Sequence, residues 1–191
     1  MKKMSSFSAL DIIRRVIDEN VQEGDHCIDA TAGRGHDTLH LCSLVGDSGH
    51  VTAFDIQQDA VDSTRALLEA NGVAHRAEVL LKSHSEMADL FDAESIAFIT
   101  FNFGWLPKGD HNIFTKKETS IQAIEQGLRL LRKGGIMSLI LYYGRETGFE
   151  ERDALLEFLP TLDNKQYTVI EMPFVNRDNC PPIPIVIIKD A

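Results

Sequence analysis

Apolar segments typical of strands alternate with amphipathic segments typical of helices along almost the whole of this chain, and this alternation constrains the fold more than any single motif. Helices are expected over residues 7–20, 36–45, 57–71, 115–132 and 149–159. Strands are expected over residues 26–30, 50–56, 78–82, 96–103, 136–143, 167–175 and 183–189. The alternation predicts an α/β fold with a doubly wound, mostly parallel sheet and right-handed crossovers.

The end of the chain departs from this alternation. No helix is expected between the last two strands, so they should pair as an antiparallel hairpin at the edge of the sheet. Pro184 comes at the start of the last strand, where a missing N–H is tolerated. The apolar strands of this hairpin could also support a homodimer.

Composition sets limits on the class of protein. The chain has 191 residues, of which 43% are hydrophobic, and we expect one domain over residues 1–191. It has no apolar run near 18 residues and no apolar segment typical of a signal peptide, so neither a membrane span nor export is expected. Its three cysteines are far apart, which argues against a disulfide framework and favours a cytoplasmic location.

The net charge of −10 argues against broad attraction to nucleic acid, although it leaves room for a local basic patch. Such a patch is predicted near the ligand edge of the sheet by Lys108, Lys116, Lys117 and Arg145, which could contact phosphates or simply form ordinary surface. His36 and His40 have a spacing that can bind metal, but no third ligand presents itself, so no metal site is predicted.

A glycine-containing turn follows the first predicted strand, in the stretch "IDATAGRGHDT". Ligands of such sheets bind at the carboxyl ends of the strands, and Gly33 and Gly35 allow positive φ and a close backbone approach. Asp55 ends the next strand, 22 positions after Gly33, and a carboxylate there suits a ribose diol. Together these residues predict a nucleoside-containing ligand.

The details of the turn favour S-adenosylmethionine over a dinucleotide. Thr38 stands where the dinucleotide fingerprint has its third glycine, and Asp37 would face a pyrophosphate at the start of the helix. A cationic sulfonium with an amino-acid tail tolerates that carboxylate, and Asp29 could accept from its ammonium group. A P-loop is excluded because no Gly-Lys-Ser/Thr follows. A nicotinamide dehydrogenase is disfavoured by Thr38 and by the absence of a convincing set of hydride-transfer residues.

The acceptor side of the site is predicted after the strand over residues 96–103. Asn102 emerges there at the ligand edge, where its amide could accept from a target amine. That amine must be neutral to attack a methyl group, so a base or a pocket that disfavours the ammonium is needed. Asp110, His111 and Tyr142 are the candidate bases, and Trp105 could stack on a nucleobase.

Several motifs together resemble one small family of class I methyltransferases, the putative rRNA methylases, which includes bacterial tRNA (5-aminomethyl-2-thiouridine) methyltransferases. They are "DATAGRGHDT", "FDIQ", "SHSEM", "FNFGWLPKGD", "LRKGG" and the asparagines and prolines of residues 176–182. The resemblance implies a seven-stranded sheet, S-adenosylmethionine as cofactor and tRNA as substrate. It also implies methyl transfer to the exocyclic amine of 5-aminomethyl(-2-thio)uridine at the wobble position.

The resemblance also implies roles for individual residues. The methionine end of the cofactor would be lined by Asp29, Thr31, Gly33, His36, Asp37 and Thr38. Asp55 and Gln57 would hold the ribose and adenine side, and Ser83 and His84 would flank the adenine. Asn102, Phe103 and Gly104 would form the wall nearest the sulfonium.

The chain departs from this family's pattern mainly on the presumed substrate side. The departures are Trp105, Lys108, Tyr143 and Arg145, which are candidate substrate-binding residues, and Arg34, where members of the family carry asparagine. They put the exact substrate in question more than the chemistry. A methyltransferase for rRNA or for a small amine is one alternative, and a cofactor-binding module without catalysis is another.

Overall fold

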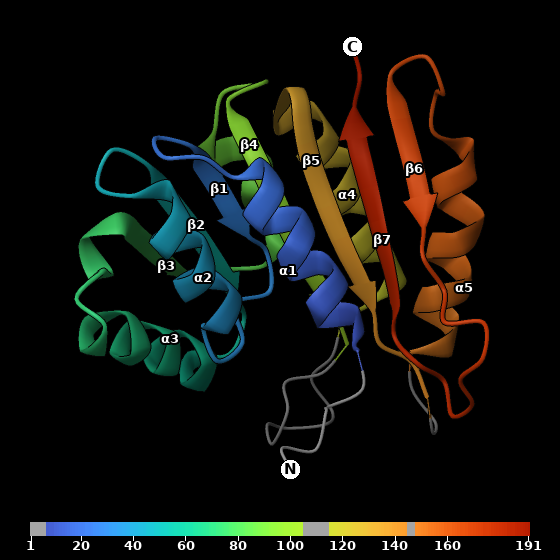
Figure 1. Ribbon diagram of the computed structural model, residues 1–191, viewed down its shortest axis with the longest axis horizontal. Coiled ribbons are helices and arrows are strands. Elements are labelled where there is room, and N and C mark those ends of the chain that lie inside the picture. The colour runs from blue at the N-terminus through green and yellow to red at the C-terminus, as the bar shows by residue number, and fades with distance from the viewer. Residues whose placement is uncertain (1–6, 105–114, 145–147) are drawn as a thin grey trace.

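The structure is a computed structural model that describes residues 7–104, 115–144 and 148–191 (Figure 1). The strands are β1 (His26–Asp29), β2 (His50–Asp55), β3 (Ala77–Leu81), β4 (Ile96–Phe103), β5 (Leu131–Leu141), β6 (Tyr167–Glu171) and β7 (Ile183–Lys189). The α-helices are α1 (Ala9–Asn20), α2 (His36–Val45), α3 (Gln58–Ala70), α4 (Lys117–Leu130) and α5 (Phe149–Phe158), and the 3₁₀ helices are η1 (Ala74–Arg76), η2 (His84–Leu90) and η3 (Leu159–Thr161).

The strands form one seven-stranded sheet in the order β3-β2-β1-β4-β5-β7-β6. The first five strands of the chain are parallel, and β7 pairs antiparallel with both β5 and β6. The predicted doubly wound sheet with an antiparallel C-terminal hairpin is therefore confirmed. The order of the strands reverses between β1 and β4, because the chain passes from β1 to β2 on one side and from β4 to β5 on the other. Such sheets hold their ligands at this point, outside the carboxyl ends of the strands.

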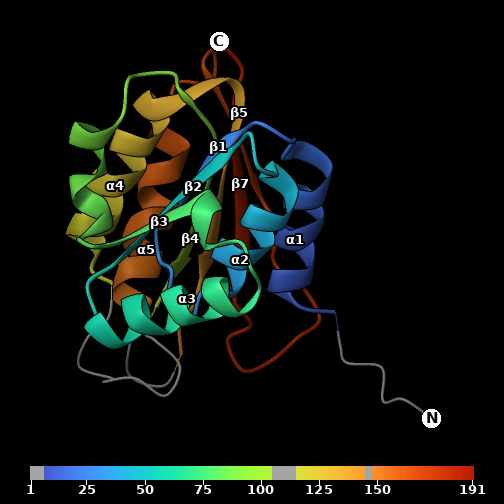
Figure 2. The ribbon, with the colours of Figure 1, turned by 90° about the vertical axis from the view of Figure 1, so that its left-hand side faces the viewer.

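Helices cover both faces of this sheet, as Figure 2 shows. On one face, α1, α2 and α3 bury a cluster that contains Ile13, Leu41 and Val61. On the other, α4 and α5 bury a cluster that contains Ile124 and Leu155. Along a single strand the side chains alternate between these clusters, and this is why the central strands read as continuous apolar runs.

The boundary between α4 and β5 lies earlier than the sequence predicts. The helix was expected to reach residue 132 and to stop at the glycine pair, but it ends at Leu130. Leu131 is fully buried and pairs with Ile96, so the chain is already extended there. Phe98 then pairs with Ile136, which leaves residues 132–135 opposite Ala97 alone. The glycine pair therefore forms an irregularity within the strand, with Gly134 at φ 75°, and does not end the helix.

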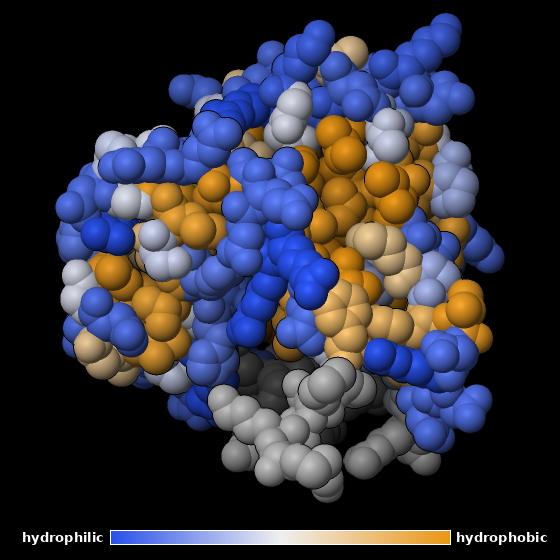
Figure 3. All heavy atoms as spheres, in the orientation of Figure 1, coloured by the Kyte–Doolittle hydropathy of each residue, from blue (hydrophilic) through white to orange (hydrophobic). Residues whose placement is uncertain are grey.

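The C-terminal hairpin is antiparallel and lies at the edge of the sheet, as predicted, but its first strand is shorter than expected. Strand β6 ends at Glu171 and not at residue 175, although the Met172 amide still donates to the Pro184 carbonyl at 2.9 Å. Strand β7 lies between β5 and β6, so β6 alone forms that edge of the sheet. Figure 3 shows hydrophobic side chains gathered over β5 and β7 beside α1.

The homodimer was predicted from the apolar strands of this hairpin. Ile170 on the edge strand β6 is 44% exposed. The homodimer stays a prediction.

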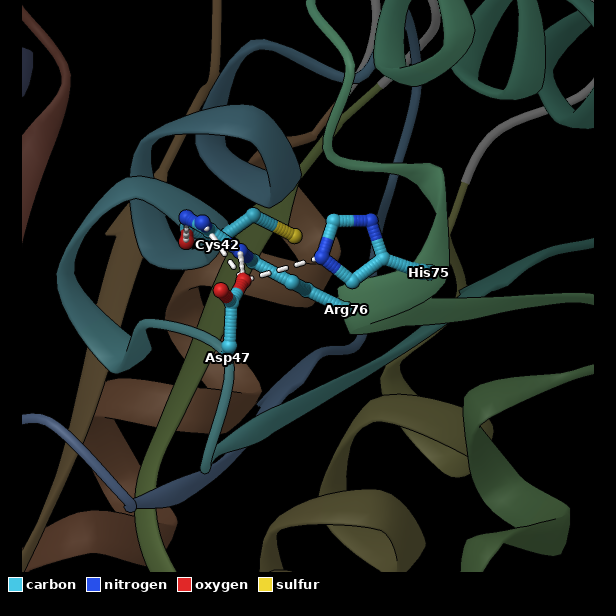
Figure 4. A network of polar contacts seen from close by, with 4 residues as sticks. All are labelled: Cys42, Asp47, His75 and Arg76. Atoms are coloured by element: carbon cyan, nitrogen blue, oxygen red, sulfur yellow. Dashed lines mark hydrogen bonds and ion pairs between the residues drawn. The ribbon is translucent and has the colours of Figure 1, made fainter.

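At the amino edge of the sheet, a polar cluster ties the loop before β2 to η1 (Figure 4). One Asp47 oxygen accepts from His75 Nε2 at 2.9 Å and from Arg76 Nε at 2.7 Å. Arg76 also donates to the Cys42 carbonyl at 3.1 Å, which reaches the end of α2. These contacts lie at the edge opposite the carboxyl ends of the parallel strands. Within the described residues, no helix is both long and apolar enough to cross a membrane.

Candidate active site

A cavity of about 690 Å³ opens at the carboxyl ends of β1, β2 and β4, the lower edge of the sheet in Figure 1. This volume falls in the range of small-molecule sites. Its lining comes from the turn after β1, the ends of β2 and β4, the start of η2 and the amino-terminal turns of α1 and α4. Segments that are far apart in the sequence therefore meet at one site, as the strand pattern predicted.

The turn after β1 needs its glycines for two reasons. Gly33 and Gly35 have φ angles of 54° and 81°, in the left-handed region that favours glycine. Gly35 also lies so close to α3 that an added Cβ would be 2.9 Å from the Thr64 Cα. The turn brings the chain from β1 into α2 with its backbone against the cavity, as the sequence predicted.

Asp29 supports this turn from inside the protein. Its carboxylate is fully buried and accepts from the Thr31 amide at 3.2 Å and from the Thr38 hydroxyl at 2.6 Å. Burial, with the nearby Asp37 charge, raises the pKa of Asp29 to about 7. Asp29 is not part of the cavity lining, whereas Asp37 is. Asp37 is therefore the carboxylate of this turn that a ligand can reach.

Asp55 joins the first turn to the end of β2. One of its oxygens accepts from the Gly33 amide at 2.9 Å, and the other accepts from the Gln57 amide at 2.9 Å. Each carboxylate oxygen can accept more than one hydrogen bond, so the side chain can still receive a ligand hydroxyl. The expected proximity of Asp55 to the glycine turn is thus present in the structure.

His84 forms part of the cavity wall with one ring nitrogen unsatisfied. Burial lowers its pKa to about 4, so the ring is neutral near pH 7. Its Nε2 atom is buried and has no hydrogen-bond partner among the described residues. The ring stands edge-on to Phe101 and Phe103 at the end of β4. A buried nitrogen without a partner at a cavity wall indicates a group that a ligand satisfies.

Asn102 is the second residue of the cavity lining with a buried polar atom that has no partner among the described residues. Its backbone amide donates to the Thr31 hydroxyl at 2.7 Å, and its Nδ2 donates to Asp37 at 2.8 Å. Because a carboxylate only accepts, this contact fixes which end of the amide is Nδ2. Its Oδ1 is buried and has no partner among the described residues. Tyr142 lines the same cavity, and burial, with the Asp37 charge, raises its pKa to about 12.

Most of the residues predicted to bind the cofactor meet at this cavity. Its lining includes Thr31, Gly33, His36, Asp37, Asp55, Gln57, Ser83, His84, Asn102 and Gly104. Four others, Asp29, Gly35, Thr38 and Phe103, are buried behind that lining. Of the candidates on the substrate side, Tyr142 is in the lining, while Tyr143 packs on Phe149 beneath the Arg152 guanidinium.

The remaining candidates, Trp105, Lys108, Asp110, His111 and Arg145, lie outside the described residues. The two histidines considered for metal binding have different surroundings. His40 Nε2 lies 2.8 Å from the Asp18 carboxylate on α1, whereas His36 lines the cavity. Within the part of the chain that the structure describes, no three metal-ligating side chains come together.

Sequence reasoning missed a buried carboxylate beneath the acceptor side of the cavity. Glu151, in the first turn of α5, accepts from Thr115 at 2.7 Å and from Ser120 at 2.5 Å. The Thr115 hydroxyl in turn accepts from the Gly104 amide at 2.9 Å, and the Thr115 amide donates to the Gly104 carbonyl at 3.1 Å. Glu151 therefore holds together the two chain segments that flank residues 105–114. No local motif marks it, since its partners are 31 and 36 positions away.

Comparison with known proteins identifies the family. The family model described as "Putative rRNA methylase" matches residues 51–188. The chain belongs to this family. A curated relative from Arabidopsis thaliana, "tRNA (mnm(5)s(2)U34)-methyltransferase, chloroplastic", is 34% identical over 91% of the chain, and the chain spans 66% of that relative's length. The resemblance to the putative rRNA methylases is confirmed.

Solved structures agree with this assignment to the methylase family. A putative rRNA-methylase from Clostridium thermocellum has a TM-score of 0.94 and 40% identity, covering 97% of this chain and 100% of its own. A putative methyltransferase from Streptococcus mutans, solved in complex with SAH, has a TM-score of 0.86 and 30% identity, covering 95% of this chain and 97% of its own. The predicted methyltransferase class, with its S-adenosylmethionine cofactor, is confirmed at the level of the family.

Proposed function

We propose that this methyltransferase transfers a methyl group from S-adenosylmethionine to the exocyclic amine of 5-aminomethyl(-2-thio)uridine at the tRNA wobble position. The name of the Arabidopsis relative supports the nucleoside and the RNA. The observation that carries the proposal within this chain is the unpartnered Oδ1 of Asn102 at the cavity wall. An acceptor atom in that position fits a substrate that presents an N–H group.

The residues of the cavity fit the cofactor. Asp55 is available to the ribose hydroxyls, and the unpartnered Nε2 of His84 is available to an adenine edge. Asp37 supplies negative charge near the sulfonium and the ammonium group of the methionine part. When bound, S-adenosylmethionine supplies a methyl group that is electrophilic because it is attached to a positively charged sulfur.

Asp37 and Asn102 act together on the acceptor in this proposal. Because Asp37 holds the Nδ2 end of the amide, Oδ1 is left to accept an N–H of the substrate amine. That hydrogen bond fixes the direction of the nitrogen lone pair for in-line attack on the methyl carbon. Only the neutral amine is nucleophilic, and the nearby Asp37 carboxylate favours the ammonium form, so a proton acceptor is needed.

Tyr142 serves as a hydrogen-bond donor and not as a base in this proposal. A pKa of about 12 keeps its phenol protonated at neutral pH. In methyl transfer the amine nitrogen would bond to the methyl carbon as the C–S bond breaks with its electron pair going to sulfur, and one amine proton would pass to an acceptor group. This leaves Asp110 and His111 as the candidate proton acceptors that sequence reasoning named.

The decisive experiment is transfer of a labelled methyl group to tRNA that lacks the wobble methyl, followed by mass spectrometry of the nucleosides. We expect the mass of 5-aminomethyl-2-thiouridine to rise by one methyl group. Ribosomal RNA serves as a parallel substrate, because the family description names it. Methylation of rRNA alone would replace the proposed substrate, and binding of S-adenosylhomocysteine without transfer to any RNA would indicate a module without catalysis.

Asn102→Ala tests the acceptor role within the same assay. We expect the affinity for S-adenosylhomocysteine to stay within about threefold of wild type, while kcat falls at least tenfold because the amine loses its positioning contact. Calorimetric titration measures the first quantity and initial rates at saturating tRNA measure the second. Thr119→Ala, also in the cavity lining, is the matched control and should retain kcat. Unchanged kcat in Asn102→Ala would leave Asn102 a structural residue.

A further inference from the structure

Four basic side chains stand at the cavity although the chain as a whole is acidic, with a net charge of −10. They are Arg14 on α1, Arg34 in the turn after β1, Lys82 after β3 and Lys116 at the start of α4. Arg14, Lys82 and Lys116 are exposed, so their charged ends reach solvent. The four residues come from four segments that are distant in the sequence and meet only through the fold. We refer to them as the basic rim.

Within the described ranges 7–104, 115–144 and 148–191, the rim side chains form no ion pair and no side-chain hydrogen bond. Some basic residues elsewhere are engaged, since Arg132 pairs with Asp25 at 2.9 Å and Lys189 pairs with Glu94 at 3.0 Å. Lys117, which sequence reasoning grouped with Lys116, pairs with Glu150. Of the predicted basic cluster, Lys116 therefore stays available for a partner, whereas Lys117 is neutralised locally.

The acidic groups of the cavity do not cancel this positive charge at its mouth. The Asp37 carboxylate accepts from Asn102, and the Asp55 carboxylate accepts from two backbone amides, so both are held against the wall. The cavity thus has negative charge inside, which suits a sulfonium, and positive charge around its opening. A substrate that enters this cavity should therefore carry a hydrogen-bond donor on the part that goes in first and negative charge on the part that stays at the opening.

We propose that the basic rim binds the backbone phosphates on either side of the target nucleotide, which is turned out of its RNA into the cavity. The inference rests on the proposed function and specifies how the RNA is held. A nucleobase must leave its stack to reach an enclosed site, and the phosphates that flank it then lie at the mouth of that site. Phosphate contacts by lysine and arginine position the substrate without reading its sequence.

The rest of the protein is acidic, and this charge helps to orient the RNA on the basic rim. Because the net charge repels RNA elsewhere, attraction is confined to the rim, and the RNA is oriented with its target nucleotide toward the cavity. Arg34, in the turn after β1, brings a fourth positive charge to the cavity lining. The rim should make RNA binding dependent on salt, since each phosphate contact releases condensed counterions.

A matched pair of triple variants tests the basic rim. The rim variant is Arg14→Gln, Lys82→Gln, Lys116→Gln. The control variant is Arg129→Gln, Lys133→Gln, Lys165→Gln, which removes one arginine and two lysines that are exposed near the opposite, amino edge of the sheet. Both variants change the net charge equally, so a difference between them reports position and not total charge.

Binding of unmodified anticodon stem-loop RNA is measured by fluorescence anisotropy in the presence of S-adenosylhomocysteine, and KM and kcat are measured with tRNA. We expect the rim variant to bind at least tenfold more weakly, to have a raised KM and to keep kcat within about threefold. The slope of log K against log salt should fall by about 2, as expected for three lost phosphate contacts to a single strand. The control variant should match wild type within about twofold, and both should bind S-adenosylhomocysteine normally.

Equal RNA affinity and salt slope in the rim and control variants would overturn the proposal, even if wild-type protein methylates tRNA. If wild-type protein methylates no RNA, the binding experiment still decides on the rim separately. Salt-dependent RNA binding that only the rim variant loses would support the rim under a different substrate. An absence of any RNA binding by wild-type protein would overturn it.

Discussion

Two buried carboxylates support the two walls of the cavity, and they do so in different ways. Asp29 lies behind the turn after β1, where it accepts from Thr31 and Thr38. Glu151 lies behind the opposite wall, where it accepts from Thr115 and Ser120. In both cases burial raises the pKa of the carboxyl group. The first supports residues proposed to hold the cofactor, and the second supports the stems of the segment proposed to face the RNA.

The two carboxylates bond different segments of the chain, so the two walls of the cavity are supported independently. Asp29 reaches partners 2 and 9 positions away, so the turn is braced within one segment of the chain. Glu151 joins β4 to the start of α4 from a third element, α5, so its wall depends on helix packing. Removing either carboxylate should therefore disturb a different binding step.

Asp29→Ala should have the largest effect on stability. It leaves the buried Thr38 hydroxyl and the Thr31 amide without their acceptor, at a cost of about 2–4 kcal/mol in the free energy of unfolding. Urea unfolding measures this quantity. Asp29→Asn is the matched control, because its amide oxygen keeps one acceptor in place, so a smaller loss is expected. If Asp29→Ala unfolds as wild type does, the turn does not depend on this carboxylate.

The pH dependence of stability tests the raised pKa of Asp29 by itself. The pKa of Asp29 rises from 3.8 to about 7 on folding, so between these values the folded protein binds more protons than the unfolded chain. This contribution to stability is therefore largest near pH 4 and declines as pH rises toward 7. The wild-type free energy of unfolding minus that of Asp29→Asn should fall from pH 5 to 7, with a slope approaching about 1.4 kcal/mol per pH unit.

Glu151 is present in both of those proteins, so its own raised pKa cancels from the difference. Unfolding curves at four or five pH values between 5 and 8 suffice. A difference that is flat with pH would mean that folding does not raise the pKa of Asp29.

The same contrast explains how far the sequence predicts this molecule. The strand and helix pattern predicts the sheet, because alternation of apolar segments is a local property that the fold preserves. The glycine turn and Asp55 were placed together because the carboxyl ends of parallel strands meet at one edge. Glu151 was missed because its partners become neighbours only when α5 packs on α4. The end of α4 was misplaced because the buried pairing of Leu131 with Ile96 overrides a local helix-stop signal.

The basic rim was only partly predicted for a related reason. Lys116 was named from its place near the ligand edge, but Arg14 and Lys82 join it only through the packing of α1 and the position of β3 in the sheet. Lys117 was placed in the cluster with equal weight, and its pairing with Glu150 could not be foreseen from a spacing of 33 residues. Local motifs thus predict single walls of the site, and packing between distant elements completes it.

Glu151→Gln should have the smallest effect on stability of the three changes and the most informative effect on activity. Its amide keeps one acceptor oxygen, so one hydroxyl loses its partner and the free energy of unfolding should fall by about 1 kcal/mol. Because Thr115 also bonds both polar backbone groups of Gly104, the wall that faces the RNA should loosen. We expect kcat/KM for tRNA to fall about tenfold, while the affinity for S-adenosylhomocysteine stays unchanged.

Glu150→Gln is the control for this change, because Glu150 precedes Glu151 in the same helical turn but its side chain is 79% exposed. It should retain wild-type kcat/KM, since an exposed pair with Lys117 contributes little. Four proteins are compared: wild type, Glu151→Gln, Glu150→Gln and Asp29→Asn. Initial rates give kcat/KM for tRNA, and calorimetric titration gives the affinity for S-adenosylhomocysteine. Asp29→Asn should weaken cofactor binding, and Glu151→Gln should not. If both variants weaken cofactor binding to the same extent, the two walls are coupled, and the cavity responds to the loss of either carboxylate as one unit.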